Sequence, residues 1–280
     1  MWGGKFVLHG RVPGAGAVRL DGNDYLGFTG HPEIVQAQID ALMQDQESAV
    51  QSGVFLLGDH PAHRLEKSMA SWVGKEEGFL CQSGYAANRG LLQIIADAST
   101  PIYLDSLAHA SVWEGARAPV DVFRHNDPAH LSRMMKSHGP GMVVVDSAYS
   151  TTGAVCRLHD FLDVTERHDS MIVVDESHCL GTHGPQGAGL CAELGLTERA
   201  HFITASLAKA VAGRAGFFTA PASMRYYILI SSFPNTFSSS LLPHEIAGLA
   251  ATVQVLRRSD AGCTRLHANT RRLQASLPDC

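Results

Sequence analysis

The sequence predicts an α/β fold in which a largely parallel sheet is covered by helices. Short apolar runs recur along the chain, and most lack the alternation that is typical of strands with one solvent face. Amphipathic stretches with helical spacing separate several of these runs. With 280 residues, of which 45% are hydrophobic, the chain is long enough to bury such a core.

The first elements along the chain are predicted to be helices. Residues 31–44 place apolar side chains on one side and carry Pro32 in the first turn, where proline is favoured. A second helix is predicted over 64–73. Neither stretch resembles a strand.

Seven apolar runs follow in the middle of the chain and predict strands at 78–82, 101–105, 120–124, 142–146, 171–175, 201–205 and 215–220. Helical patterns lie between several of them, at 84–97, 109–118, 128–138 and 158–168. Repetition of strand, helix and strand predicts parallel pairing.

The end of the chain is predicted to be helical, from Pro243 through Val255 and then in a polar, arginine-rich stretch to about Ser276. No stretch after residue 245 has the apolar pattern that is typical of a strand. We therefore expect an N-terminal segment at 1–45, a large domain at 46–245, and the helical start of a further domain at 246–280.

Composition favours a cytoplasmic protein without nucleic-acid or membrane partners. The net charge of −5 and the pI near 6.3 give no overall attraction to anionic polymers or lipids. The N-terminus lacks the continuous apolar core of a signal peptide, and no stretch approaches the roughly 18 apolar residues of a membrane span. Six cysteines without a C-x-x-C pair suggest neither a disulfide framework nor a zinc ribbon.

Fifteen histidines raise the possibility of a metal site. Only His178, Cys179 and His183 cluster, and Gly181 and Gly184 around them are typical of a turn. Surface and helix-end histidines explain most of the others, so we expect no bound metal.

Two of the best strand candidates end in an acid, Asp146 and Asp175. In open α/β sheets, ligands bind beyond the carboxyl ends of the strands, so both acids are expected at one rim of the sheet. A turn or helix-capping aspartate is the structural alternative for each.

Lys209 is the candidate nucleophile. It follows an apolar run in T-A-S-L-A-K (204–209) and has small neighbours. Burial lowers the pKa of an ammonium group and frees the amine to form an imine with an aldehyde. A lysine that extends to solvent from a buried edge is the alternative.

The surroundings of Lys209 suit pyridoxal phosphate (PLP). Asp175 can pair with the pyridine nitrogen, and His178 can donate near the ring hydroxyl and a substrate carbonyl. A phosphate can bind at Ser83-Gly84-Tyr85, between a strand and a helix, with hydroxyls from Thr204 and Ser206. His109 begins another helix and can stack on the ring, or can simply cap that helix.

These motifs resemble the α-oxoamine synthases, a family of fold-type I PLP enzymes that includes aminolevulinate synthase, 8-amino-7-oxononanoate synthase and serine palmitoyltransferase. The similarity covers about residues 20–257. The motifs that carry it are N-D-Y-L-G (23–27), H-R-L-E (63–66), Q-S-G-Y-A-A-N (82–88), D-S-L-A-H-A-S (105–111), V-D-E-S-H (174–178), S-L-A-K (206–209) and F-S-S-S-L-L-P (237–243).

Within this family the sequence is most similar to the quorum-sensing autoinducer synthases that make long-chain α-aminoketones and α-hydroxyketones. The motifs behind this are S-V-W-E-G-A-R (111–117), V-V-V-D-S-A-Y-S-T-T-G (143–153), D-E-S-H-C-L-G-T-H-G-P-Q-G-A-G-L (175–190) and T-A-S-L-A-K (204–209). Many family members have Glu where this chain has Asp146, and the autoinducer branch shares the Asp. Phe55, Leu56 and Leu57 would suit an aliphatic acyl chain, although a core-facing loop explains them equally well.

The resemblance implies a seven-stranded, mostly parallel sheet with helices on both faces. It implies that Lys209 forms the Schiff base and moves the Cα proton, and that Asp175, His109 and His178 contact the cofactor ring. The residues implied around the cofactor and its phosphate are Ser83, Gly84, Tyr85, Ser147, Thr204, Ser206 and, from the partner subunit of a homodimer, Ser238 or Ser239.

The implied reaction condenses an α-amino acid with an acyl-CoA and releases CoA and CO₂. Family members continue into a C-terminal α/β domain, and that small domain is expected to be largely missing here. Three alternatives stay open: another α-oxoamine synthase, such as the 8-amino-7-oxononanoate or aminolevulinate type; a truncated, non-catalytic PLP-fold chain; and a metal hydrolase built on the histidines.

Overall fold

The structure is a computed structural model that describes residues 14–16, 22–44, 50–116 and 119–277. Parts of the predicted N-terminal segment, at 1–13 and 17–21, lie outside the described residues, as do Arg117 of the 111–117 motif and Cys280.

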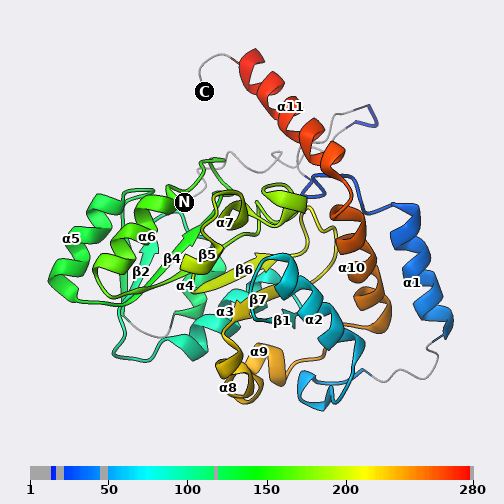
Figure 1. The fold of residues 1–280 in the computed structure, drawn as a ribbon, viewed down its shortest axis with the longest axis horizontal. Helices are drawn as coiled ribbons and strands as arrows, with labels where there is room; N and C mark the ends of the chain where they lie inside the picture. The colour runs from blue at the N-terminus through cyan, green and yellow to red at the C-terminus, as the bar shows by residue number, and fades with distance from the viewer. Residues whose placement is uncertain (1–13, 17–21, 45–49, 117–118, 278–280) are drawn as a thin grey trace.

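A seven-stranded sheet organises the chain (Figure 1). Its strands are β1 (Glu77–Cys81), β2 (Ile102–Asp105), β3 (Val120–Phe123), β4 (Met142–Asp146), β5 (Met171–Asp175), β6 (Phe202–Ser206) and β7 (Gly216–Ala220). Their order across the sheet is β1-β7-β6-β5-β4-β2-β3. Only β7 runs antiparallel to its neighbours, β1 and β6, so the expected mostly parallel sheet is confirmed.

Helices cover both faces of the sheet, as expected (Figure 1). The described helices are α1 (Pro32–Gln44), α2 (Pro61–Trp72), α3 (Gly84–Ile95), α4 (Ala110–Gly115), α5 (Pro128–His138), α6 (Leu158–Arg167), α7 (Leu190–Glu193), α8 (Arg225–Ser231), α9 (Phe233–Thr236), α10 (Pro243–Leu256) and α11 (Asp260–Ser276).

The side chains of β4 show how the strands serve two cores. Met142 and Val144 pack in a cluster with residues of α3 and α4, whereas Val143 and Val145 pack with residues of α5 and α6. All four side chains are buried. This two-sided burial explains why the strand sequences are continuously apolar.

Helix ends account for the differences from the predicted boundaries. The helix predicted over 64–73 begins earlier, because Pro61 occupies its first turn and the side chain of His60 caps it. The helix predicted over 109–118 is shorter, because the backbone at Ala116 is already extended. Helices α7, α8 and α9 were not predicted.

The predicted three-part division stays a prediction, although two of its parts are in contact. Helix α1 packs along α10, and Ile34 shares a core cluster with Ile246 and Leu249. Helix α11 has no buried residue and projects from the sheet (Figure 1). None of the helices in the described part of the chain is both long and apolar enough to cross a membrane.

Candidate active site

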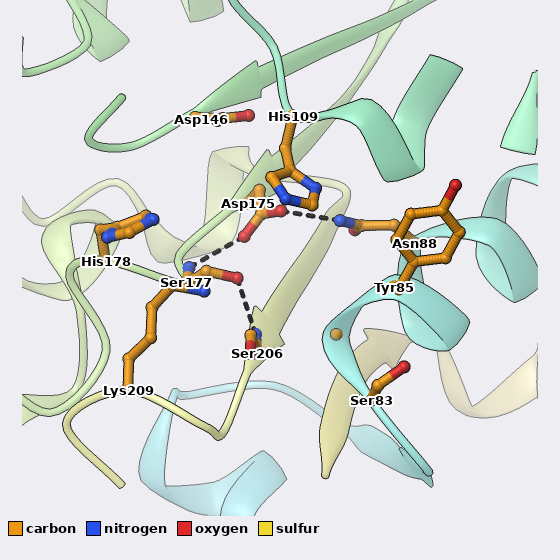
Figure 2. Close-up of a pocket in the computed structure, with 11 residues that line it drawn as sticks. Ser83, Tyr85, Asn88, His109, Asp146, Asp175, Ser177, His178, Ser206 and Lys209 are labelled. Carbon is orange, nitrogen blue, oxygen red and sulfur yellow. Dashed lines mark hydrogen bonds between the residues drawn. The ribbon is translucent and has the colours of Figure 1, made fainter. Parts of the chain in front are cut away.

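A cavity of about 230 Å³ lies where the carboxyl ends of β4, β5 and β6 meet the start of α3 (Figure 2). It is lined by Ser83, Gly84, Tyr85, Asn88, His109, Asp146, Asp175, Ser177, His178, Ser206 and Lys209. The segments that form it are far apart in sequence, and the parallel sheet brings them together at one rim.

Lys209 reaches the cavity from the turn after β6. Figure 2 shows its side chain extended toward Ser177 and Asp175 rather than out to solvent. Burial lowers the pKa of Lys209, although the negative charges of Asp175 and Asp146 oppose this shift. The amine is therefore easier to deprotonate than that of a surface lysine.

Asp175 is held rigidly at the end of β5. Its side chain is buried, and it accepts hydrogen bonds from Asn88 Nδ2 at 2.7 Å and from the backbone N–H of Ser177 at 2.8 Å. In the view of Figure 2, the carboxylate lies between the side chains of His178 and Asn88, below the ring of His109. Two fixed donors orient this carboxylate before any ligand binds.

Asp146 pairs with Asp175 in the register of β4 and β5, so the two acids meet at one rim as expected. Burial raises the pKa of Asp146 well above its usual range, and the charge of Asp175 adds to the shift. The Oδ1 atom of Asp146 has no hydrogen-bond partner among the described residues. Both carboxyl groups are buried, but Asp175 accepts two hydrogen bonds whereas one oxygen of Asp146 has no donor among the described residues.

His109 both caps a helix and lines the cavity. Its side chain accepts from the backbone N–H of Ser111 at the start of α4, and its Nδ1 lies 2.8 Å from Ser111 Oγ. Asn88 Nδ2 donates to the same Oγ at 2.9 Å. A continuous chain of hydrogen bonds thus runs from Asp175 through Asn88 and Ser111 to His109.

His178 enters the cavity from the turn after β5. Its Nδ1 lies 2.7 Å from the hydroxyl of Tyr25, a residue 153 positions earlier in the chain. Burial lowers the pKa of His178 to about 4, and the nearby positive charge of Lys209 contributes. The imidazole is neutral at neutral pH.

The start of α3 forms an anion-binding geometry. Ser83 caps the helix by accepting from the backbone N–H of Ala86, which leaves the first N–H groups directed outward. A Cβ on Gly84 would lie 2.5 Å from the Cβ of Ser206, so only glycine permits this approach of α3 to β6. Ser206 therefore lies against the helix N-terminus.

Four residues predicted for the site do not line this cavity. Thr204 is buried within β6, and its hydroxyl has no partner among the described residues. Ser147 is buried and donates to the backbone carbonyl of Asp175 at 3.0 Å, at the end of β5. Ser238 and Ser239 lie on another loop, where the Ser239 carbonyl accepts from Gln82 Nε2 at 2.5 Å.

Sequence reasoning did not select Asn88, Ser177 or Tyr25. Asn88 carried a usable signal, because it is a polar residue one turn into an otherwise apolar helix face and is buried. Ser177 acts through its backbone N–H and through Oγ, which accepts from the N–H of Ser206 at 2.7 Å.

The histidine and cysteine cluster separates in space. Cys179 is buried, His178 faces the cavity, and the ring of His183 lies 4.9 Å from that of His267 on α11. Gly181 and Gly184 have positive φ angles, as the predicted turn requires. Within the described residues, no group of three or more His, Cys, Asp or Glu side chains could hold a metal ion.

A substituted aromatic aldehyde phosphate fits this cavity. Apolar cavities of roughly 150 Å³ hold benzene, so about 230 Å³ leaves room for a ring with substituents. The polar groups also match. Lys209 offers an amine for the aldehyde, and Asp175 offers a fixed carboxylate. The N-terminus of α3 approaches Ser206 so closely that only glycine fits at position 84. We therefore find agreement between the residues present and the expected cofactor.

Comparisons with known proteins agree with this description. Residues 15–280 match the family described as aminotransferase class I and II. The CAI-1 autoinducer synthase of Vibrio campbellii is 42% identical over 98% of this chain and 70% of its own length. The 8-amino-7-oxononanoate synthase of Trichlorobacter lovleyi is 32% identical over 89% of this chain and 65% of its own length.

Solved structures show the same fold. A serine palmitoyltransferase from S. paucimobilis, with a bound PLP–myriocin aldimine, superposes with a TM-score of 0.84 at 25% identity over 89% of this chain and 64% of its own. The serine palmitoyltransferase of Sphingomonas wittichii gives a TM-score of 0.84 at 27% identity, over 90% and 65%. This chain thus spans about two thirds of the length of these relatives.

Proposed function

This chain belongs to the aminotransferase class I and II family and, within it, to the α-oxoamine synthases, and on that premise we propose that it takes part in the decarboxylative condensation of an α-amino acid with an acyl-CoA. One observation carries the proposal. The amine of Lys209, the fixed carboxylate of Asp175 and the helix N-terminus at Ser83 and Gly84 line a single cavity.

The cofactor of the proposed reaction is PLP. When bound, PLP supplies an electron sink for negative charge at the amino-acid Cα. Asp175 would hold the pyridine nitrogen, His109 would stack on the ring, and Ser83, Gly84, Tyr85 and Ser206 would hold the phosphate. The hydrogen bonds to Asp175 support its part, because they fix the orientation of a carboxylate that lines the cavity.

Lys209 would hold the cofactor and move the Cα proton through Nζ. Burial lowers the pKa of Lys209, which favours the neutral amine that this proton transfer requires. The carboxylates of Asp175 and Asp146 face the same space and stabilise the ammonium form after the proton has moved. The Lys209 amine can therefore both accept the Cα proton and donate it back.

The proposed acyl donor carries a long aliphatic chain. Phe55 and Leu57 are 66% and 79% exposed, so the core-facing alternative fails for these two and holds only for Leu56, which packs against the core. The loop is joined to the chain near the cavity by the bridge between Ser52 and Ser239 and by the bond from Gln82 to Ser239. Exposed apolar side chains on this loop suit an alkyl chain better than a carboxylate. The product would then be a long-chain α-aminoketone, a precursor of a quorum-sensing signal.

The proposal includes a homodimer with a shared active site. Ser239 is exposed, Ser238 is half-buried, and neither lines the cavity of its own subunit. Phe233 and Phe237 are 54% and 63% exposed beside them. An apolar face around these serines would be covered when they reach the phosphate of the partner subunit.

A panel of acyl donors tests the proposed reaction. Purified protein with PLP and each candidate amino acid is supplied with decanoyl-, pimeloyl- or succinyl-CoA, and the release of free CoA thiol and CO₂ is measured. We expect turnover that favours decanoyl-CoA by at least about tenfold in kcat/KM, since additional buried methylenes each contribute binding energy. A preference for pimeloyl-CoA would identify an 8-amino-7-oxononanoate synthase instead. PLP binding without any thiol release would indicate a non-catalytic chain.

A further inference from the structure

A hydrogen bond between Tyr25 and His178 links the N-terminal part of the chain to the cavity. The hydroxyl oxygen of Tyr25 lies 2.7 Å from Nδ1 of His178, and the two ring centroids are 6.2 Å apart. Tyr25 is half-buried and lies outside the set of residues that line the cavity.

The backbone around Tyr25 is fixed by its neighbour Asp24. The Asp24 carboxylate accepts from the N–H of Phe28 at 2.8 Å and from the N–H of Thr29 at 2.9 Å. Phe28 is buried in the core cluster that contains α10. The phenol is therefore presented to His178 by a rigid turn.

The direction of this hydrogen bond follows from the chemistry of its partners. A phenol donates strongly but accepts weakly, because its lone pair is delocalised into the ring. An unprotonated imidazole nitrogen is a good acceptor. Burial keeps the phenol neutral by raising the pKa of Tyr25. The Tyr25 O–H thus donates to Nδ1.

A neutral imidazole carries a single N–H, so accepting at Nδ1 places the proton on Nε2. Within the described residues, Nε2 of His178 makes no hydrogen bond to the protein. Figure 2 shows the His178 ring at the edge of the space between Lys209 and Asp175. With the opposite tautomer, Nε2 could only accept.

We propose that Tyr25 is a positioning residue that fixes His178 as the Nε2–H tautomer and thereby makes it a hydrogen-bond donor to ligands in the cavity. Tyr25 acts through His178 and touches no reacting atom. Only the expected effect on catalysis rests on the proposed function. The tautomer itself is a property of the protein alone.

The tautomer can be measured without cofactor or substrate. Nitrogen-15 NMR of the apo protein with labelled histidine separates protonated from unprotonated ring nitrogens, and loss of signals in His178→Gln assigns His178. We expect the wild-type protein to show a protonated Nε2 and an unprotonated Nδ1 at neutral pH.

Tyr25→Phe removes only the hydroxyl and is expected to redistribute the His178 proton toward a mixture of tautomers. The matched control is Tyr103→Phe, which removes the hydroxyl that donates to the Gly139 carbonyl at 2.7 Å, away from the cavity. The control should retain the wild-type His178 signals. In the loaded enzyme, Tyr25→Phe should lower kcat about tenfold with a smaller change in the Kd for PLP.

A wild-type signal with the proton on Nδ1 would overturn the proposal, as would an unchanged Nε2–H tautomer in Tyr25→Phe. The wild-type spectrum decides the question even if Tyr25→Phe does not fold. Absence of PLP binding would overturn the proposed function and leave the tautomer assignment standing.

Discussion

At the scale of single residues, the cavity depends on donors that were not obvious in the sequence. Asp175, His109 and Lys209 could be selected because each follows or ends an apolar run. Asn88 links Asp175 to His109, because it donates to Asp175 at 2.7 Å and to Ser111 Oγ at 2.9 Å, and that Oγ lies 2.8 Å from Nδ1 of His109. Tyr25 could not be paired with His178 from sequence, because tertiary folding alone brings residues 153 positions apart into contact.

Asn88→Ala tests the hydrogen-bond chain. The change leaves one oxygen of Asp175 without its side-chain donor, at a cost of about 1–3 kcal/mol. We expect the Kd for PLP to rise about tenfold, because the carboxylate is less well oriented. This rise corresponds to a loss of about 1.4 kcal/mol in binding free energy. Absorbance titration with PLP measures this change.

Asn235→Ala is the matched control, because Asn235 Nδ2 donates to the Leu80 carbonyl at 2.7 Å outside the cavity. It should lower thermal stability without changing the Kd for PLP. Equal effects of the two variants on the Kd would mean that Asn88 acts only through general stability.

At the scale of elements, all seven strands were predictable and three helices were not. The strands are buried on both faces, so their apolar runs identified them with ends shifted by about a residue. Helices α8 and α9 lie in 225–236, where Pro234 interrupts an apolar stretch and conceals any helical period. Helix α9 packs against α3 and β1, and these contacts cannot be read from the local sequence.

Gly84→Ala tests the contact between α3 and β6. Its Cβ would lie 2.5 Å from the Cβ and 2.7 Å from the Cα of Ser206, so the helix start must move away. We expect a loss of about 1–3 kcal/mol in the free energy of unfolding, as for other overpacked sites. The affinity for PLP should fall as well, because the phosphate site is displaced.

Gly30→Ala serves as the control, since nothing lies within 4 Å of its Cβ position. Chemical denaturation and PLP titration should give wild-type values for this variant. A Gly84→Ala protein with unchanged stability and unchanged PLP affinity would contradict the close approach of α3 to Ser206.

At the scale of the whole molecule, the buried histidines connect stability to pH. Burial lowers the pKa of His178, His183 and His201, whereas hydrogen bonding to Glu66 raises that of His63. A histidine with a lowered pKa takes up its proton more readily in the unfolded chain. The stability associated with such a group is therefore lost as pH falls.

For His178 the window lies between the ordinary value of 6.5 and about 4. Its contribution to this acid loss is at most about 3 kcal/mol and smaller after solvent screening. Thermal unfolding followed by circular dichroism at pH 7 and pH 4.5 measures the loss. His178→Gln should lose less stability than the wild type between these two pH values, and an equal loss would contradict the burial of this imidazole.

The sheet as a whole determines where the chemistry can occur. Parallel strands place Asp146 and Asp175 side by side at one rim, and the turn after β6 adds Lys209. This placement could be predicted because ligand sites in such sheets lie beyond the carboxyl ends of the strands. The role of Ser238 and Ser239 could not be predicted in this way, because the proposal for these two residues requires a second subunit.

The most direct test of this account is to identify the amine that binds PLP. The protein is incubated with PLP, the imine is reduced with borohydride, and the modified peptide is located by mass spectrometry. The account predicts a visible absorbance band before reduction, a single adduct on Lys209, and loss of both in Lys209→Ala. A band that persists in Lys209→Ala, or an adduct on another lysine, would contradict it.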